Sequence, residues 1–69
     1  MARRKKEPVE DHRRTIAQAA HQLFSSKGLA ATSVDMIAKA ADYSKATLYV
    51  YFKNKEEIFF YLVYKHNQT

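Results

Sequence analysis

The sequence predicts an all-α domain, a three-helix bundle containing a helix-turn-helix and followed by the start of a fourth helix. Three observations support this prediction. Apolar residues recur at three- and four-residue spacing, a capping residue precedes each later segment, and no pair of segments carries hairpin signals. Sixty-nine residues make one small domain. The expected helices cover about residues 10–27, 33–41, 44–51 and 54–66.

The first expected helix has one apolar stripe and a clear end. The stripe consists of Ile16, Ala19, Ala20, Leu23 and Phe24. Gly28, the only glycine in the chain, follows directly after Lys27. Glycine accepts the left-handed conformation that ends a helix, and a lysine there faces the negative end of the helix dipole.

The second and fourth expected helices begin at capping residues. Thr32 or Ser33 caps the second helix, whose apolar positions continue to Ala41. Asn54 caps the fourth, and Glu57 occupies the third helical position of a capping box. Both helix starts are therefore predicted from local side-chain chemistry.

The third segment is ambiguous by propensity. Residues 47–52 are rich in β-branched and aromatic side chains, which favours a strand. However, a strand needs a partner for its backbone groups, and no other segment alternates. A helix capped by Ser44 instead directs Leu48, Tyr51 and Phe52 to one side. With the short turn before it, this helix completes a helix-turn-helix, a motif whose second helix enters the DNA major groove.

Positive charge is concentrated in two places. The first group consists of Arg3, Arg4, Lys5 and Lys6. The remaining residues, 7–69, hold eight basic and seven acidic groups and are nearly balanced in charge. A second, local group consists of Lys45, Lys53 and Lys55. Both groups suit contact with phosphate. Two interpretations of the arm, residues 1–9, stay open: a flexible solvated tail, and an arm that contacts nucleic acid in the minor groove.

The composition argues against an enzyme, a metal site and a membrane protein. There is no cysteine, and the histidines His12, His21 and His66 lack the spacing of metal ligands. No acid–base pair suggests catalysis, and we expect no cofactor. The sequence contains neither a signal peptide nor a long apolar run, so we expect a cytoplasmic protein.

One long run carries a family resemblance. The run T-S-V-D-M-I-A-K-A-A-D-Y-S-K-A-T-L-Y-V-Y-F-K-N-K-E-E-I-F, with A-x-x-L-F-x-x-K-G over residues 20–28, resembles the amino-terminal domain of TetR-family bacterial transcriptional regulators. The similarity covers about residues 10–64. It implies a homeodomain-like three-helix bundle in a DNA-binding domain of residues 10–69, with the helix-turn-helix at about 33–52.

The resemblance also implies partners. Members of this family bind a palindromic operator in double-stranded DNA as a homodimer, usually as repressors. A separate carboxy-terminal domain makes the dimer and binds a small-molecule inducer, and we expect that this domain is missing from the 69 residues.

The resemblance assigns DNA contacts by position. Lys45, Ala46 and Thr47 correspond to base-reading positions, where a lysine can donate to guanine O6 and N7. The positions that correspond to phosphate contacts are Thr32, Ser33, Ser44, Tyr49, Tyr51 and Lys55. For the two tyrosines, the plainer alternative is a partly buried aromatic side chain of the core.

Three residues depart from the usual family pattern. Asp42 replaces a glycine of the turn, although aspartate tolerates left-handed geometry better than most residues. Ala46 replaces a glycine and limits how closely the backbone approaches a base. Asp35 stands where many relatives have a basic residue, and it either stabilises the helix amino terminus or accepts from cytosine N4. The operator sequence of a relative therefore does not transfer.

Two surfaces suggest other partners. The fourth helix is apolar nearly all round through Phe59, Phe60, Tyr61 and Tyr64, which predicts a surface for the missing domain. The competing function is a basic amphipathic module that binds an acidic protein or an anionic membrane surface.

Overall fold

The computed structural model describes residues 9–67, which form four helices joined by short turns. Their bounds are α1 Val9–Lys27, α2 Val34–Ala41, α3 Lys45–Tyr51 and α4 Lys55–Asn67. Each helix begins and ends within one residue of its predicted bounds, and the described part of the chain contains no strand. The all-α fold class and the helical interpretation of the third segment are confirmed. The basic residues Arg3, Arg4, Lys5 and Lys6 lie outside the described residues.

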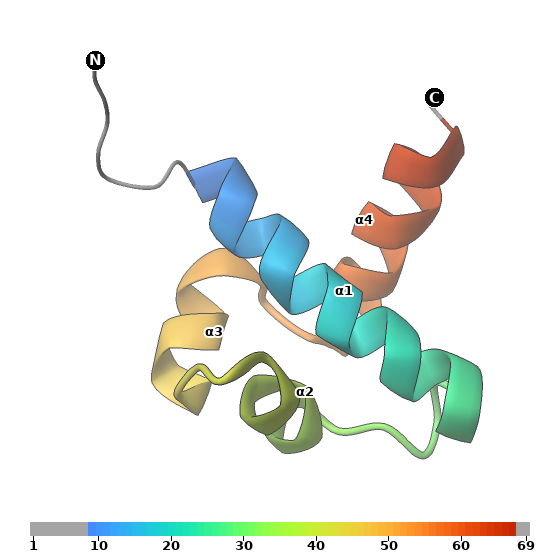
Figure 1. The fold of residues 1–69 in the computed structure, drawn as a ribbon, viewed down its shortest axis with the longest axis horizontal. Coiled ribbons are helices and arrows are strands. Elements are labelled where there is room, and N and C mark those ends of the chain that lie inside the picture. Colours follow the sequence, from blue (N-terminus) through green and yellow to red (C-terminus); the bar gives the residue numbers. More distant parts are fainter. Residues whose placement is uncertain (1–8, 68–69) are drawn as a thin grey trace.

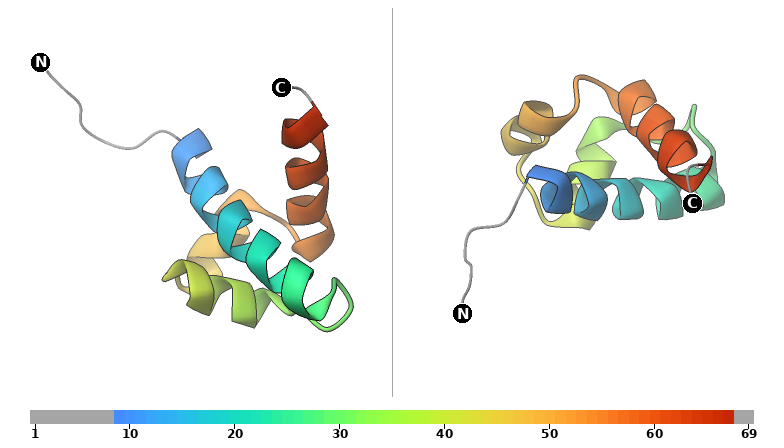
Figure 2. Two further views of the ribbon diagram at one scale, coloured as in Figure 1. Left: turned by 45° about the vertical axis from the view of Figure 1, so that its right-hand side comes forward. Right: turned by 90° about the horizontal axis from the view of Figure 1, so that it is seen from above.

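The first helix is the centre of the packing. It contacts α2, α3 and α4, and α2 also contacts α3. The helices α2 and α3 lie together on one side of α1, while α4 runs away from them (Figures 1 and 2). The core consists of Ile16, Ala17, Ala20, Ile37, Ala38, Leu48, Phe52 and Ile58. Full burial of an isoleucine or leucine side chain contributes roughly 1.5–3 kcal/mol, so these few residues supply much of the stability.

The buried surface of α1 is broader than the predicted stripe. Ala17, which lies outside that stripe, is 1% exposed, whereas Ala19 is only half-buried. Leu23 and Phe24 pack at the edge of the core. The difference arises because α1 contacts three other helices, and a single stripe cannot serve all of them.

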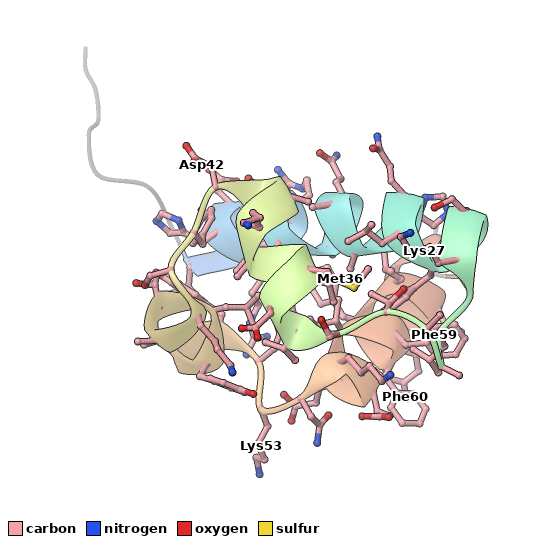
Figure 3. The ribbon with its side chains drawn as sticks, turned by 90° about the horizontal axis from the view of Figure 1, so that it is seen from below. Lys27, Met36, Asp42, Lys53, Phe59 and Phe60 are labelled. Carbon is pink, nitrogen blue, oxygen red and sulfur yellow. The ribbon has the colours of Figure 1, made fainter. Side chains whose placement is uncertain are left out.

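The turn between α2 and α3 bends through a left-handed aspartate. Asp42 has φ 66° and ψ 39°, and its N–H donates to the Lys39 carbonyl at 3.1 Å. The N–H of Tyr43 donates to the Ala38 carbonyl at 2.8 Å. These two bonds satisfy carbonyl groups at the end of α2. The short turn therefore forms without glycine, and Asp42 lies at its outer edge (Figure 3).

The fourth helix packs on α1 through Ile58 and Tyr61 and also exposes aromatic side chains. Tyr61 is half-buried, and its hydroxyl donates to the Glu10 carboxylate. It therefore belongs to the α1–α4 contact and not to the free apolar surface predicted for it. Phe60 and Tyr64 are 69% and 73% exposed. Phe59 is exposed too, although its ring meets that of Phe24 edge to face (Figure 3).

Within residues 9–67, no helix is long and apolar enough to cross a membrane. The same part of the chain contains no group of three or more His, Cys, Asp or Glu side chains that could hold a metal ion.

Candidate nucleic-acid interface

The first turn of α3 presents the three predicted base-reading residues to the outside. Lys45, Ala46 and Thr47 are all exposed. On the opposite side of the helix, Leu48 is fully buried in the core. Ser44 caps the helix, because its Oγ accepts from the Thr47 N–H at 3.0 Å and its hydroxyl donates to Thr47 Oγ1 at 2.8 Å. The first turn of α3 is thus fixed by the buried Leu48 and by the Ser44 cap, while its outer side is accessible to a ligand.

A shallow hollow of about 410 Å³ lies beside this turn. It is bordered by the start of α2, one side of α3 and the start of α4. Five predicted contact residues line it, namely Thr32, Ser33, Lys45, Tyr49 and Lys55. The fold therefore brings together side chains that are separated by up to 23 positions in the sequence.

Ser33 and Tyr49 offer hydroxyl groups to this hollow. Ser33 is exposed, and its Oγ caps α2 by accepting from the Met36 N–H at 3.2 Å. The hydroxyl proton of Ser33 has no acceptor among the described residues. Tyr49 is 46% exposed, and its hydroxyl makes no hydrogen bond within the described part of the chain. Both groups can therefore donate to an anion.

Thr32 is buried and makes its hydrogen bonds within the fold. The residue is only 1% exposed, its hydroxyl donates to the Gly28 carbonyl at 2.8 Å, and its N–H donates to the Leu29 carbonyl at 3.2 Å. Both donors serve the turn between α1 and α2. Contact between Thr32 and a phosphate stays a prediction, and both the hydroxyl and the amide donor of Thr32 are engaged within the fold.

Lys55 also holds this turn in place. Its Nζ donates to the carbonyls of Leu29 and Thr32, each at 2.8 Å, and lies 3.4 Å from the Ala30 carbonyl. An ammonium group has three donors, and these three acceptors match them. Lys55 therefore joins the start of α4 to the α1–α2 turn, where phosphate contact was predicted. No spacing signal marks this role, because its acceptors are backbone atoms 23 to 26 residues away.

Tyr51 packs against a histidine that the sequence did not single out. The rings of Tyr51 and His12 stack with centroids 5.2 Å apart at 23°. His12 Nδ1 lies 2.7 Å from the Tyr43 hydroxyl oxygen. His12 thus connects α1 to the helix-turn-helix at two points. Tyr51 is half-buried, in line with the alternative that made it a core aromatic, while its hydroxyl has no partner in the described residues.

Ser44 and Asp35 lie next to the first turn of α3. The Ser44 hydroxyl is engaged in its own cap, as described above, so it has no proton left for a phosphate. The Asp35 carboxylate lies 3.2 Å from Lys45 Nζ, and both side chains are exposed. Asp35 also sits in the first turn of α2, where a negative charge is favourable.

The sequence of most of the helical domain matches a described protein family. The model for bacterial regulatory proteins of the tetR family matches residues 16–62, more than half of the chain. The chain belongs to the TetR family. The family prediction is therefore confirmed, and so is the prediction of a helix-turn-helix domain from a transcriptional regulator.

Relatives of this TetR-family chain carry the same description. The chain is 45% identical over 49 residues to YhgD of Bacillus subtilis, an uncharacterized HTH-type transcriptional regulator, covering 71% of this chain and 26% of that protein. It is 39% identical over 59 residues to the HTH-type transcriptional regulator AcrR of Shigella flexneri, covering 86% and 27%. An HTH-type transcriptional regulator of Staphylococcus aureus is 34% identical over 65 residues, covering 94% and 35%. The TetR-family chain thus spans about a quarter to a third of the length of these relatives.

Proposed function

We propose that this TetR-family chain binds double-stranded DNA sequence-specifically, as the operator-reading domain of a transcriptional regulator that acts as a repressor. The observation that carries this proposal is the exposed first turn of α3. It presents Lys45, Ala46 and Thr47 to the outside. Lys45 also lines one concave surface together with the free hydroxyls of Ser33 and Tyr49.

The chemistry of this turn suits the major groove. Lys45 is placed to donate to guanine O6 or N7, and the Ala46 methyl suits contact with the methyl group of thymine. The Thr47 hydroxyl is oriented by Ser44 before any DNA arrives, which lowers the entropy lost on binding. The three side chains lie on consecutive positions of one helical turn, so they would meet neighbouring bases.

The hydroxyls around the hollow suit the DNA backbone. Tyr49 and Ser33 donate hydrogen bonds to phosphate oxygens of the DNA strand next to α3. The partial positive charge at the amino terminus of α2 also favours a phosphate there. Tyr51 contributes its free hydroxyl at the edge of this surface. Lys55 acts at longer range, because its charge remains beside the hollow although its donors are used.

We further propose that two such domains bind a palindromic operator when the regulator is a homodimer in the bacterial cytoplasm. The exposed side chains of Phe60 and Tyr64 on α4 would contact the part of the regulator that makes the dimer and binds the inducer. The three relatives reported above are described as transcriptional regulators, and this description gives no support to a module that binds acidic proteins or membranes.

The direct test compares two tyrosines. A duplex is enriched from a random library by the chain, and its affinity is measured by fluorescence anisotropy at fixed salt. Tyr49→Phe removes one hydroxyl donor to phosphate and should weaken binding about threefold to tenfold. Tyr64→Phe removes a hydroxyl from the exposed face of α4 and should change nothing. Equal affinities for wild type and Tyr49→Phe, with unchanged helix content, would refute the assignment of this face.

Lys55→Ala is unsuitable for this purpose. The substitution removes three hydrogen bonds that hold the α1–α2 turn, so lost DNA binding would not distinguish a missing contact from a displaced turn.

A further inference from the structure

The ion pair between Asp35 and Lys45 joins α2 to the first turn of α3 at the surface. The carboxylate Oδ1 and Nζ are 3.2 Å apart, and the side chains of Asp35 and Lys45 are 69% and 53% exposed. Exposed pairs of this kind contribute little to folding. Lys45 is the only ion-pair partner of Asp35 among the described residues. We therefore consider which ligand groups this ion pair can bind.

An ammonium beside a carboxylate offers a cluster of donors next to an acceptor. A phosphate would meet both charges at once, and the carboxylate would repel it. A base edge is different, because base pairs present donors and acceptors side by side in the major groove. The acid next to Lys45 thus favours base edges over the DNA backbone.

The pattern of this pair matches one base pair better than the other. In G·C, the two guanine acceptors N7 and O6 are adjacent, and the cytosine N4 amino donor comes next. The Lys45 ammonium can bind both acceptors while Asp35 accepts from N4. In A·T, the adenine amino group separates the two acceptors, and the thymine methyl group would face a charged pair. A group of donors followed by an acceptor, as in Lys45 and Asp35, is therefore complementary to the major-groove edge of G·C.

We propose that Asp35 is a specificity-determining residue, which with Lys45 forms a two-residue reader for one G·C base pair in each half-site. This inference rests on the proposed function, in which the first turn of α3 reads DNA. Asp35 also prevents Lys45, a flexible point charge, from turning to a nearby phosphate. Removal of Asp35 should thus lower discrimination without lowering the affinity for non-specific DNA.

The test is a selection of bound duplexes from a random library, followed by affinity measurements on duplexes that differ at one position. The chain, Asp35→Ala and Glu56→Ala are compared. Glu56 is a matched control, since it is an exposed acid that lines the same hollow and makes no ion pair within the described residues. We expect Asp35→Ala to reduce the preference for G·C over A·T at one position about tenfold. Preferences at other positions, and those of Glu56→Ala, should stay unchanged.

A second variant guards against loss of structure. Asp35→Asn is isosteric, and its amide both donates and accepts, which suits adenine N6 and N7. It should move the preference at the same position from G·C toward A·T. Helix content measured by circular dichroism shows whether each variant is folded during the assay.

The double variant tests whether the two residues act as a unit. Lys45→Ala should abolish the same G·C preference, and adding Asp35→Ala should cause little further loss. Fully additive losses would overturn the two-residue reader. Unchanged base preferences in both Asp35 variants, or an equal loss of affinity for every duplex, would also overturn it. If the wild-type chain enriches no sequence, the proposed function itself fails.

Discussion

The starts of α3 and α4 have the same local design and different roles. In each, a capping residue is followed at once by a lysine, Lys45 after Ser44 and Lys55 after Asn54. The cap accepts the N–H three residues onward, at 3.0 Å in α3 and 2.9 Å in α4. Yet Lys45 remains at the surface beside a single carboxylate, whereas Lys55 donates to backbone carbonyls of a distant turn. The same pattern of a cap followed by a lysine thus leads to one surface lysine and one structural lysine.

The difference comes from what lies opposite each helix start. The carbonyls of Leu29 and Thr32 belong to the turn between α1 and α2 and need a donor that α-helix hydrogen bonds do not supply. The start of α4 lies against this turn, so the Lys55 ammonium reaches these carbonyls. The first turn of α3 has no such neighbour and faces outward. Exposure and available acceptors, not residue type, decide which lysine stays at the surface and which one is bound within the fold.

The largest expected effect tests the structural lysine. Lys55→Ala should lower the free energy of unfolding by about 2–3 kcal/mol, because it removes charge-assisted hydrogen bonds to the α1–α2 turn and leaves the Thr32 carbonyl without its donor. A domain of this size has only roughly 3–10 kcal/mol in total. Urea denaturation followed by circular dichroism measures the change. Lys53→Ala is the control, since Lys53 projects away from the body of the domain and its loss should cost less than about 0.5 kcal/mol (Figure 3). Similar midpoints for both variants would contradict the role of Lys55.

The second prediction concerns the surface lysine. Lys45→Ala should weaken binding to a selected duplex by about 1–3 kcal/mol, because a base contact is lost. The free energy of unfolding should change by less than about 1 kcal/mol, since an exposed ion pair contributes little. Anisotropy and urea denaturation measure the two quantities on the same samples. A large loss of stability in Lys45→Ala would remove the contrast with Lys55.

The third prediction tests whether the two caps are equivalent. Ser44→Ala and Asn54→Ala should each lower the free energy of unfolding by about 1 kcal/mol, because each leaves a first-turn N–H without its acceptor. Ser44→Ala should in addition weaken base discrimination, since Ser44 orients the Thr47 hydroxyl. Thermal melts and duplex selection measure these effects. Costs that differ by more than about 2 kcal/mol would show that the local designs are not equivalent.

The smallest expected effect concerns the second attachment of α4. Burial and the hydrogen bond to Glu10 raise the pKa of Tyr61 from 10.0 to about 12. Since the folded state holds the proton more tightly, the contribution of this group to stability is complete below pH 10 and is lost as pH rises toward 12. The effect should be small, because the side chain is only partly buried.

The measurement for Tyr61 is the urea midpoint at several pH values between 9 and 12. Tyr61→Phe should lose less stability than wild type over this range, and the comparison cancels the titration of lysines and other tyrosines. Parallel curves for the two proteins would show that the Glu10 contact does not influence the titration.

Helix positions could be predicted well because their signals are local. Ser33, Ser44 and Asn54 are capping residues, and α2, α3 and α4 each begin directly after one of them. The placement of Lys45, Ala46 and Thr47 on an exposed turn also follows from the cap and from the buried position of Leu48. These features depend on neighbours within about four residues.

Side-chain roles were harder to predict where the partner is distant. Thr32, Lys55 and Tyr61 were expected on binding surfaces, but all three make hydrogen bonds within the fold. The stacking of His12 on Tyr51 was not predicted either, since the two residues are 39 positions apart and no spacing rule connects them. Such contacts depend on how α1 packs against the other helices.

The sequence by itself determined four helices, their caps and the family signature, because helix periodicity and capping act over a few residues. Only the tertiary structure decided that Lys45 lies beside Asp35 and that Lys55 holds the α1–α2 turn. The physical reason is that a lysine donates to whichever acceptors the packing brings within reach. The two helix starts share a cap followed by a lysine, and the different roles of these lysines follow from the packing of distant segments around α1.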